Sequence, residues 1–132
     1  MTETKDKLPL VLLVEDNETI RGAFVILLEE SGYRVRAAAT GAEALSVAVE
    51  SQPDLILMDL GLPDLGGLEV TRRLKADPRT SDSVIVALTG RALETDQQAC
   101  FDAGCAGYLA KPVDTQMLLK TIPEYLGTEN AK

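Results

Sequence analysis

The chain has 132 residues, a formal net charge of −8 and no histidine. Its length fits one domain with its own core, and its acidic balance argues against direct binding of nucleic acid or of an anionic membrane surface. The lack of histidine excludes serine–histidine and cysteine–histidine catalysis. Cys100 and Cys105 make a poor zinc site without histidine, and we expect reduced thiols that pack in the core or lie on the surface.

The two ends of the chain differ in expected structure from the part between them. Residues 1–7 are polar and charged and lack the apolar segment of a signal peptide. No apolar run approaches the length that spans a membrane. We therefore expect a flexible leader at residues 1–7, one domain at residues 8–126, a flexible tail at residues 127–132 and a cytoplasmic location.

The first half of the domain alternates short apolar runs with helical patterns. Leu10–Val14 is an unbroken apolar run that predicts a buried strand, and apolar residues at helical spacing predict an amphipathic helix over residues 18–30. Residues 33–38 alternate small or apolar residues with arginine, as an edge strand does. A second helix follows from Gly41 and ends before Pro53. Leu55–Met58 then predicts a second buried strand.

The second half repeats the alternation. In order, it predicts a glycine-rich loop at residues 61–67, a helix at 68–76, a strand at 84–88, a helix at 93–103, a short strand at 106–110 and a last helix from residue 113. Leu118, Ile122 and Tyr125 are the expected inward positions of the last helix. Pro123 lies inside this pattern and lacks a backbone donor, so we expect it to kink or end the helix near Thr121.

Five strands that alternate with five helices predict an α/β fold. Such a rhythm is typical of βαβ units with right-handed crossovers and a parallel sheet. The first, third and fourth strands are the most apolar and therefore belong in the centre of the sheet. We predict the doubly wound, flavodoxin-like strand order 2-1-3-4-5.

Polar residues close four of the five predicted strands. The first strand is followed by Glu15 and Asp16, the third ends at Asp59, the fourth at Thr89 and the fifth at Lys111. The carboxyl ends of parallel strands share one edge, where open α/β folds bind ligands. Three carboxylates at that edge need a cation, and Mg²⁺ prefers oxygen ligands. The hydroxyl and the ammonium suit an anion with several oxygens, so the edge predicts phosphoryl chemistry with Asp59 as the nucleophile.

Each of these residues also has a simpler interpretation. Glu15 or Asp16 fits a helix cap, and Asp59 a turn former. Thr89 fits a helix N-cap, and Lys111 a solvated surface charge. We favour one joint site because all five residues converge on the same edge of the sheet.

Five short motifs connect this edge to a known family. They are Val14-Glu15-Asp16-Asn17, Leu57-Met58-Asp59-Leu60, Leu62-Pro63 with Gly67, Ala87-Leu88-Thr89-Gly90, and Leu109-Ala110-Lys111-Pro112. In this order and at this spacing, over residues 8–126, the sequence resembles the CheY-like receiver domain of response regulators in two-component signalling. The resemblance implies that Asp59 is the phosphoacceptor.

The resemblance also implies a metal site. Asp16 and Asp59 would bind Mg²⁺ or Mn²⁺ directly, Glu15 would act largely through water, and the backbone carbonyl of Gly61 would be a further ligand. Gly61 has no side chain where many receivers carry a polar residue that affects hydrolysis of the phosphoryl group.

The resemblance also implies roles for residues that would contact or respond to the phosphoryl group. Lys111 would pair with the phosphoryl oxygens, and Thr89 would hydrogen-bond the phosphoryl group and move toward it on activation. Tyr108 matches the switch aromatic of the family, or else is an ordinary packing residue of the edge strand. The Lys111–Pro112 bond is a candidate for the cis form.

The function implied is a phosphorylation-controlled switch or relay rather than an enzyme. A histidine kinase or a histidine phosphotransfer protein would donate the phosphoryl group, and a downstream protein would bind one of two conformations. Phosphorylation from small donors and self-dephosphorylation would accompany this role. We expect a monomer or weak dimer that is either a stand-alone receiver or a receiver taken from a hybrid kinase.

Three other functions fit the sequence less well than the switch. A receiver-like interaction module that is never phosphorylated would lack one of the key residues, and none is missing. A haloacid-dehalogenase-type phosphatase would need a second acid where Gly61 stands. A flavin carrier would need a phosphate-binding loop after the first strand, where Glu15 and Asp16 would repel the ligand.

Overall fold

The computed structural model describes residues 8–90 and 94–127. The elements, in chain order, are β1 (Leu10–Val14), α2 (Glu18–Glu30), β2 (Arg34–Ala38), α3 (Gly41–Ser51), β3 (Leu55–Asp59), α4 (Gly67–Ala76), β4 (Val84–Thr89), α5 (Glu94–Ala103), β5 (Gly107–Ala110) and α6 (Thr115–Leu126). The predicted leader, residue 93 of the predicted fourth helix, and residues 128–132 of the predicted tail lie outside this range.

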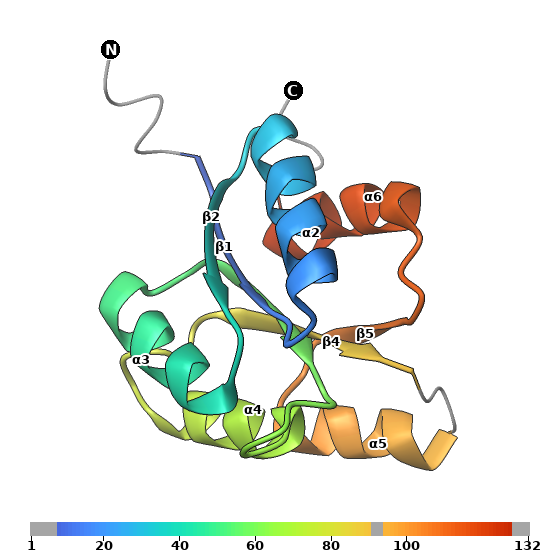
Figure 1. Cartoon of the computed structure of the whole chain (residues 1–132). Helices are drawn as coiled ribbons and strands as arrows, with labels where there is room; N and C mark the ends of the chain where they lie inside the picture. Colours follow the sequence, from blue (N-terminus) through green and yellow to red (C-terminus); the bar gives the residue numbers. More distant parts are fainter. Residues whose placement is uncertain (1–7, 91–93, 128–132) are drawn as a thin grey trace.

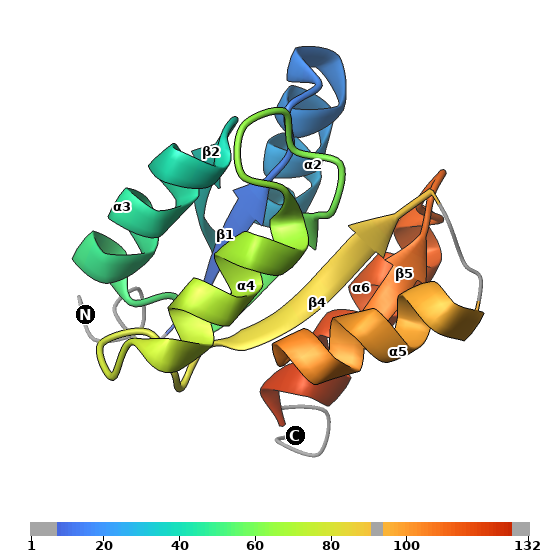
Figure 2. The same cartoon turned by 90° about the horizontal axis from the view of Figure 1, so that it is seen from below.

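The strands form one parallel sheet in the order β2-β1-β3-β4-β5, which confirms the predicted topology. Helices α2 and α6 cover one face of the sheet, and α3, α4 and α5 cover the other (Figures 1 and 2). The carboxyl ends of all five strands therefore lie along one edge. No helix among the described residues is long and apolar enough to cross a membrane.

The three central strands form the core because their side chains are buried on both faces. Val11 and Leu13 pack with the buried residues of α2 and α6, while Leu12 and Val14 pack with those of α3, α4 and α5. This alternation is what a strand covered on both faces requires. Cys100 and Cys105 are buried in the second of these layers and are not joined in a disulfide.

The first helix buries less of its apolar face than its spacing indicates. Asn17 caps it, since its Oδ1 accepts a hydrogen bond from the Ile20 backbone N–H at 3.0 Å. Leu28 is fully buried, but Ile20 is 38 % exposed and Ala23 is exposed. Both residues border an apolar pocket between α2 and the turn after β5.

The last helix corrects one prediction. We expected Pro123 to end or kink this helix near Thr121; the helix does not end there, because α6 continues through the proline to Leu126. Tyr125 and Leu126 pack against the buried cluster on this face of the sheet. Their burial offsets the backbone hydrogen bond that the proline cannot make.

Two glycines provide a test of the packing at the end of β3. An added Cβ at Gly67 would overlap the carbonyl oxygen of Asp59 and lie 2.7 Å from Leu60 Cα, whereas a Cβ at Gly22, inside α2, would meet nothing within 4 Å. We expect Gly67→Ala to lower the free energy of unfolding by about 1–3 kcal/mol through overpacking. Gly22→Ala should raise it by about 0.5–1 kcal/mol, because alanine favours the helix. Urea denaturation of the two variants measures both effects, and equal changes would contradict the packing at Gly67.

Candidate phosphorylation and metal site

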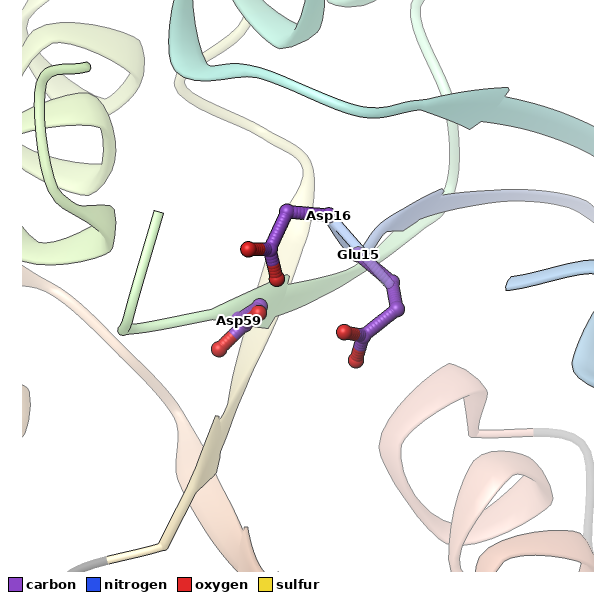
Figure 3. Close-up of side chains that lie close together, drawn as sticks. All are labelled: Glu15, Asp16 and Asp59. Atoms are coloured by element: carbon purple, nitrogen blue, oxygen red, sulfur yellow. The ribbon is translucent and has the colours of Figure 1, made fainter. Parts of the chain in front are cut away.

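Three carboxylates meet where β1 and β3 end. Val14 lies opposite Met58 in the parallel register, so Glu15 and Asp16 follow β1 beside Asp59 at the end of β3. Figure 3 shows the three side chains gathered at this edge, and one carboxylate oxygen from each lies within 4.8 Å of the others. Glu15 and Asp59 are 1 % and 3 % exposed, whereas Asp16 is exposed. The structure thus brings together the acidic residues that the sequence predicted.

Lys111 completes this cluster from the far edge of the sheet. Its Nζ lies 3.1 Å from Asp59 Oδ1 and 3.2 Å from Glu15 Oε1. Its backbone N–H donates to the carbonyl of Thr89 at 2.8 Å, and the peptide bond to Pro112 is cis. Three carboxylates face one ammonium, so two negative charges remain uncompensated by these four side chains.

Backbone groups fix the buried carboxylates in place. The Gly61 N–H donates to Asp59 Oδ1 at 2.9 Å, and the Asn17 N–H donates to Glu15 Oε2 at 3.2 Å. The guanidinium of Arg21 donates to the backbone carbonyl of Glu15 at 2.9 Å and so holds the turn after β1. Lys111 contacts the other oxygen of Glu15, Oε1, but it contacts the same oxygen of Asp59, Oδ1, to which the Gly61 N–H donates.

The surroundings shift the pKa values of the two buried carboxyl groups in opposite directions. Burial raises the pKa of Glu15 above its usual value. Burial also acts to raise the pKa of Asp59, but the Gly61 N–H and the Lys111 ammonium bring it below the usual value. The carboxylates in turn raise the pKa of Lys111 despite its partial burial. At neutral pH Asp59 is therefore an ionised carboxylate next to a charged lysine.

A pocket of about 440 Å³ opens in front of Asp59. Its lining consists of Asp16, Asp59, Leu60, Gly61, Thr89, Gly90 and Lys111. Thr89, at the end of β4, is 6 % exposed and borders the same pocket as the acids. Every predicted strand-end residue except Glu15, which lies beneath Lys111, borders this space.

Tyr108 does not line this pocket. It lies on β5 opposite Ala87 of β4, two residues before the level of Thr89. Its half-buried ring meets Phe101 of α5 edge to face, with the ring centroids 6.4 Å apart. Tyr108 thus lies two residues along the strand from the level of Thr89, on the α5 side of the sheet.

The sequence did not reveal two residues that support the site. Arg21 lies six residues after Glu15, and no spacing rule links a helical arginine to the carbonyls of the preceding turn. Asp64, in the loop after β3, accepts hydrogen bonds from the N–H groups of Gly41 and Ala42 at 2.8 and 3.0 Å. Its position in a Gly- and Pro-rich segment indicated only a turn.

The donor set fits a hard divalent cation. The candidate ligand atoms are all oxygens, from three carboxylates and the backbone of the Gly61 loop, and they carry excess negative charge. Mg²⁺ and Mn²⁺ prefer such oxygen ligands, and Mg²⁺ keeps several waters that an open pocket accommodates. A softer metal would require sulfur or imidazole ligands, and the cluster has neither.

Comparison with known proteins identifies the class. The sequence profile of the response regulator receiver domain matches residues 11–123, and the chain belongs to this family. It is a signalling protein of the two-component type.

The chain is similar to particular members of this family. It is 42 % identical over 117 residues to the polar-differentiation response regulator DivK of Brucella ovis, covering 89 % of this chain and 95 % of DivK. Chemotaxis protein CheY4 of Vibrio cholerae superposes with a TM-score of 0.85 at 30 % identity, over 89 % of this chain and 98 % of CheY4. The receiver domain of sensor histidine kinase PA1611 of Pseudomonas aeruginosa, solved with a magnesium ion in its active-site cleft, has a TM-score of 0.83 and 37 % identity, over 91 % and 98 % of the two chains.

The contact of Asp64 with α3 gives a pH-dependent prediction. Hydrogen bonds from Gly41 and Ala42 lower the pKa of Asp64 from 3.8 to about 2. A lowered pKa stabilises the fold fully above the unfolded value of 3.8, and this contribution is lost as the pH falls toward 2. The stability difference between wild type and Asp64→Asn should therefore be constant above about pH 5 and shrink below pH 4.

Urea denaturation between pH 2 and pH 7 measures this difference. Thr40→Ala is the control, because it removes the capping hydroxyl from the same helix. This hydroxyl does not titrate, so the stability lost in Thr40→Ala should not change with pH. A difference for Asp64→Asn that stays constant down to pH 2 would contradict the assigned contact.

Proposed function

We propose that Asp59 accepts a phosphoryl group from a histidine kinase or a histidine phosphotransfer protein, and that phosphorylation switches the conformation that a downstream protein binds. The observation that carries this proposal is the pairing of the buried Asp59 carboxylate with Lys111 inside a pocket that Asp16 and Thr89 also border. Membership of the receiver family supports it.

The chemistry follows from the position and charge of Asp59. One carboxylate oxygen attacks phosphorus while the P–N bond of the donor phosphohistidine breaks, and the imidazole leaves with the bonding electron pair and takes up a proton. The product is an acyl phosphate on Asp59. Lys111, already 3.1 Å from Asp59 Oδ1, is positioned to pair with a phosphoryl oxygen, and Thr89 borders the same pocket. Water that attacks the same phosphorus releases Asp59 as a carboxylate.

We propose Mg²⁺, or Mn²⁺, as the cofactor. Asp16, Asp59 and the Gly61 carbonyl would hold the ion directly, and Glu15 would act through water. When bound, the ion neutralises the charge that accumulates between the carboxylates and the phosphoryl oxygens. The excess negative charge of the cluster and the magnesium ion in the related Pseudomonas receiver domain support this assignment.

We propose Thr89 and Tyr108 as the switch. Thr89 would shift toward the phosphoryl group, and Tyr108 would turn inward into the space that this shift opens. Two features support the pairing: β4 and β5 are hydrogen-bonded neighbours, with Ala87 opposite Tyr108, and the Tyr108 ring is only half-buried against Phe101. A partner that binds the inward form better would shift the equilibrium toward it.

The setting we propose is the cytoplasm, where the thiols of Cys100 and Cys105 stay reduced. The partners are proteins: the phosphodonor and one downstream target. Phosphorylation from small donors, and self-dephosphorylation, would accompany these interactions without making the protein an enzyme in its cellular role.

Intact-mass analysis tests the phosphoacceptor directly. Incubation with Mg²⁺ and acetyl phosphate or phosphoramidate should add a single phosphoryl group to the wild type and none to Asp59→Asn, because the amide is not a nucleophile toward phosphorus. Asp54→Asn, an exposed aspartate before β3, is a matched control and should be modified like the wild type. Absence of an adduct from small donors and from a cognate kinase would favour an interaction module that is never phosphorylated.

The metal assignment predicts a separate effect for Asp16. Asp16→Asn removes one carboxylate from the proposed ligand set without touching the nucleophile, so it should raise the dissociation constant for Mg²⁺ by at least ~10-fold. Isothermal titration calorimetry measures this constant, and excess chelator should abolish phosphorylation of the wild type. Unchanged affinity in Asp16→Asn would exclude Asp16 as a ligand. Asp82→Asn, on an exposed loop distant in sequence from the cluster, serves as the charge-matched control.

A further inference from the structure

The loop between β3 and α4, residues 60–66, carries the backbone that the proposed site depends on. Gly61 within it donates its N–H to Asp59 Oδ1 at 2.9 Å and would offer its carbonyl to the cation. Gly61 and Gly66 give the loop many accessible backbone conformations, so a defined geometry requires attachments elsewhere. The ends are attached: the Leu60 N–H donates to Leu88, and the Gly67 N–H donates to the Leu60 carbonyl at 3.2 Å.

The middle of the loop is attached through Asp64. Its Oδ1 accepts a hydrogen bond from the Gly41 N–H at 2.8 Å, and its Oδ2 accepts one from the Ala42 N–H at 3.0 Å. Both donors belong to the first turn of α3, where unpaired N–H groups and the helix dipole favour a negative charge. Both oxygens of one loop side chain are therefore bonded to the backbone of a helix that lies more than 20 residues earlier in the chain.

Helix α3 also has a cap of its own. Thr40 Oγ1 accepts from the Glu43 N–H at 3.1 Å, and Glu43 Oε1 accepts from the Ala39 N–H, one residue before the cap, at 2.7 Å. The remaining donors of the first turn, Gly41 and Ala42, are the ones that Asp64 takes. Because α3 starts with a local cap and buries Ala44, Val47 and Ala48 in the core, it offers the loop a fixed point of attachment.

The first residue of α3, Gly41, leaves space for this contact. A Cβ at Gly41 would lie 2.7 Å from Val70 Cγ2, 3.1 Å from Leu65 Cβ and 3.2 Å from Asp64 Oδ1. A side chain at this position would push the loop away from the helix. Glycine at position 41 therefore allows the Asp64 carboxylate and the neighbouring Leu65 to lie directly against the start of α3.

We propose that Asp64 is a positioning residue: by bonding the loop to the start of α3, it holds the Gly61 backbone where that backbone serves the divalent cation and the phosphoryl group. This inference rests on the function proposed above. Asp64 acts through the loop backbone, so its removal should weaken metal binding while the ligands themselves remain in the chain.

The test compares Asp64→Ala with Thr40→Ala, since both remove capping contacts from the same helix and only the first detaches the loop. Isothermal titration with Mg²⁺ should give a dissociation constant about 10-fold higher for Asp64→Ala and one within about 2-fold of wild type for Thr40→Ala. In metal-free protein, amide hydrogen exchange followed by NMR should be faster for the Gly61 N–H in Asp64→Ala and unchanged in Thr40→Ala. Asp64→Asn keeps one acceptor oxygen and should fall between Asp64→Ala and wild type.

The proposal would be overturned if Asp64→Ala kept the wild-type dissociation constant for Mg²⁺ and the wild-type exchange rate of the Gly61 N–H. Equal changes of both quantities in Thr40→Ala would also overturn it, because they would indicate general loosening of α3. If Asp64→Ala does not fold, Asp64→Asn and Asp64→Ser carry the same comparison, and wild-type values in both overturn it. The proposed function fails separately if wild type binds no Mg²⁺ and accepts no phosphoryl group. In that case the metal-free exchange of Gly61 still decides whether Asp64 holds the loop.

Discussion

The parallel pairing of β1 with β3 is the constraint on which the rest of the site depends. Because Val14 lies opposite Met58, Glu15 and Asp59 leave the sheet at the same level. A shift of one residue would turn every side chain of β3 to the other face and separate the acids. Burial on both faces opposes such a shift, since both strands are buried throughout their length. The core therefore sets the geometry of a polar site that contributes nothing to the core itself.

The cost of burying two carboxylates explains the remaining parts of the site. An ionised acid away from water is unfavourable unless cations and hydrogen bonds compensate for it. Lys111 and the Gly61 N–H provide this compensation for Asp59 and keep it ionised, whereas Glu15 keeps a raised pKa. Compensation is incomplete, and the remaining negative charge fits the divalent cation that we propose for this site. Stability and chemistry thus oppose each other at this edge, as is common at functional sites.

The loop after β3 and the turn after β1 illustrate how a reactive group is held without being enclosed. Arg21 bonds the backbone of Glu15, and Asp64 bonds the backbone of α3, and both side chains act from outside the pocket. Such supporting contacts fix ligand geometry while the pocket remains open to a phosphodonor. The two ends of the pocket are therefore held by different elements, α2 on one side and α3 on the other.

The sequence by itself determined the strand order and the strand-end residues. Unbroken apolar runs such as Leu55–Met58 can only be buried on both faces, and the polar residue that follows each run must then lie at the carboxyl edge of a parallel sheet. Local patterns of this kind are sufficient because burial and periodicity are properties of consecutive residues. The boundaries of most elements follow in the same way.

Only the tertiary structure decided the contacts between residues distant in the chain. Helix α6 continues through Pro123 because Tyr125 and Leu126 pack on the sheet, a gain that local propensity does not contain. The reach of Lys111 across the sheet to both Glu15 and Asp59, and the bond of Asp64 to the start of α3, depend on how separate elements pack. No spacing in the sequence encodes these distances, because each is set by the packing of helices against a common sheet.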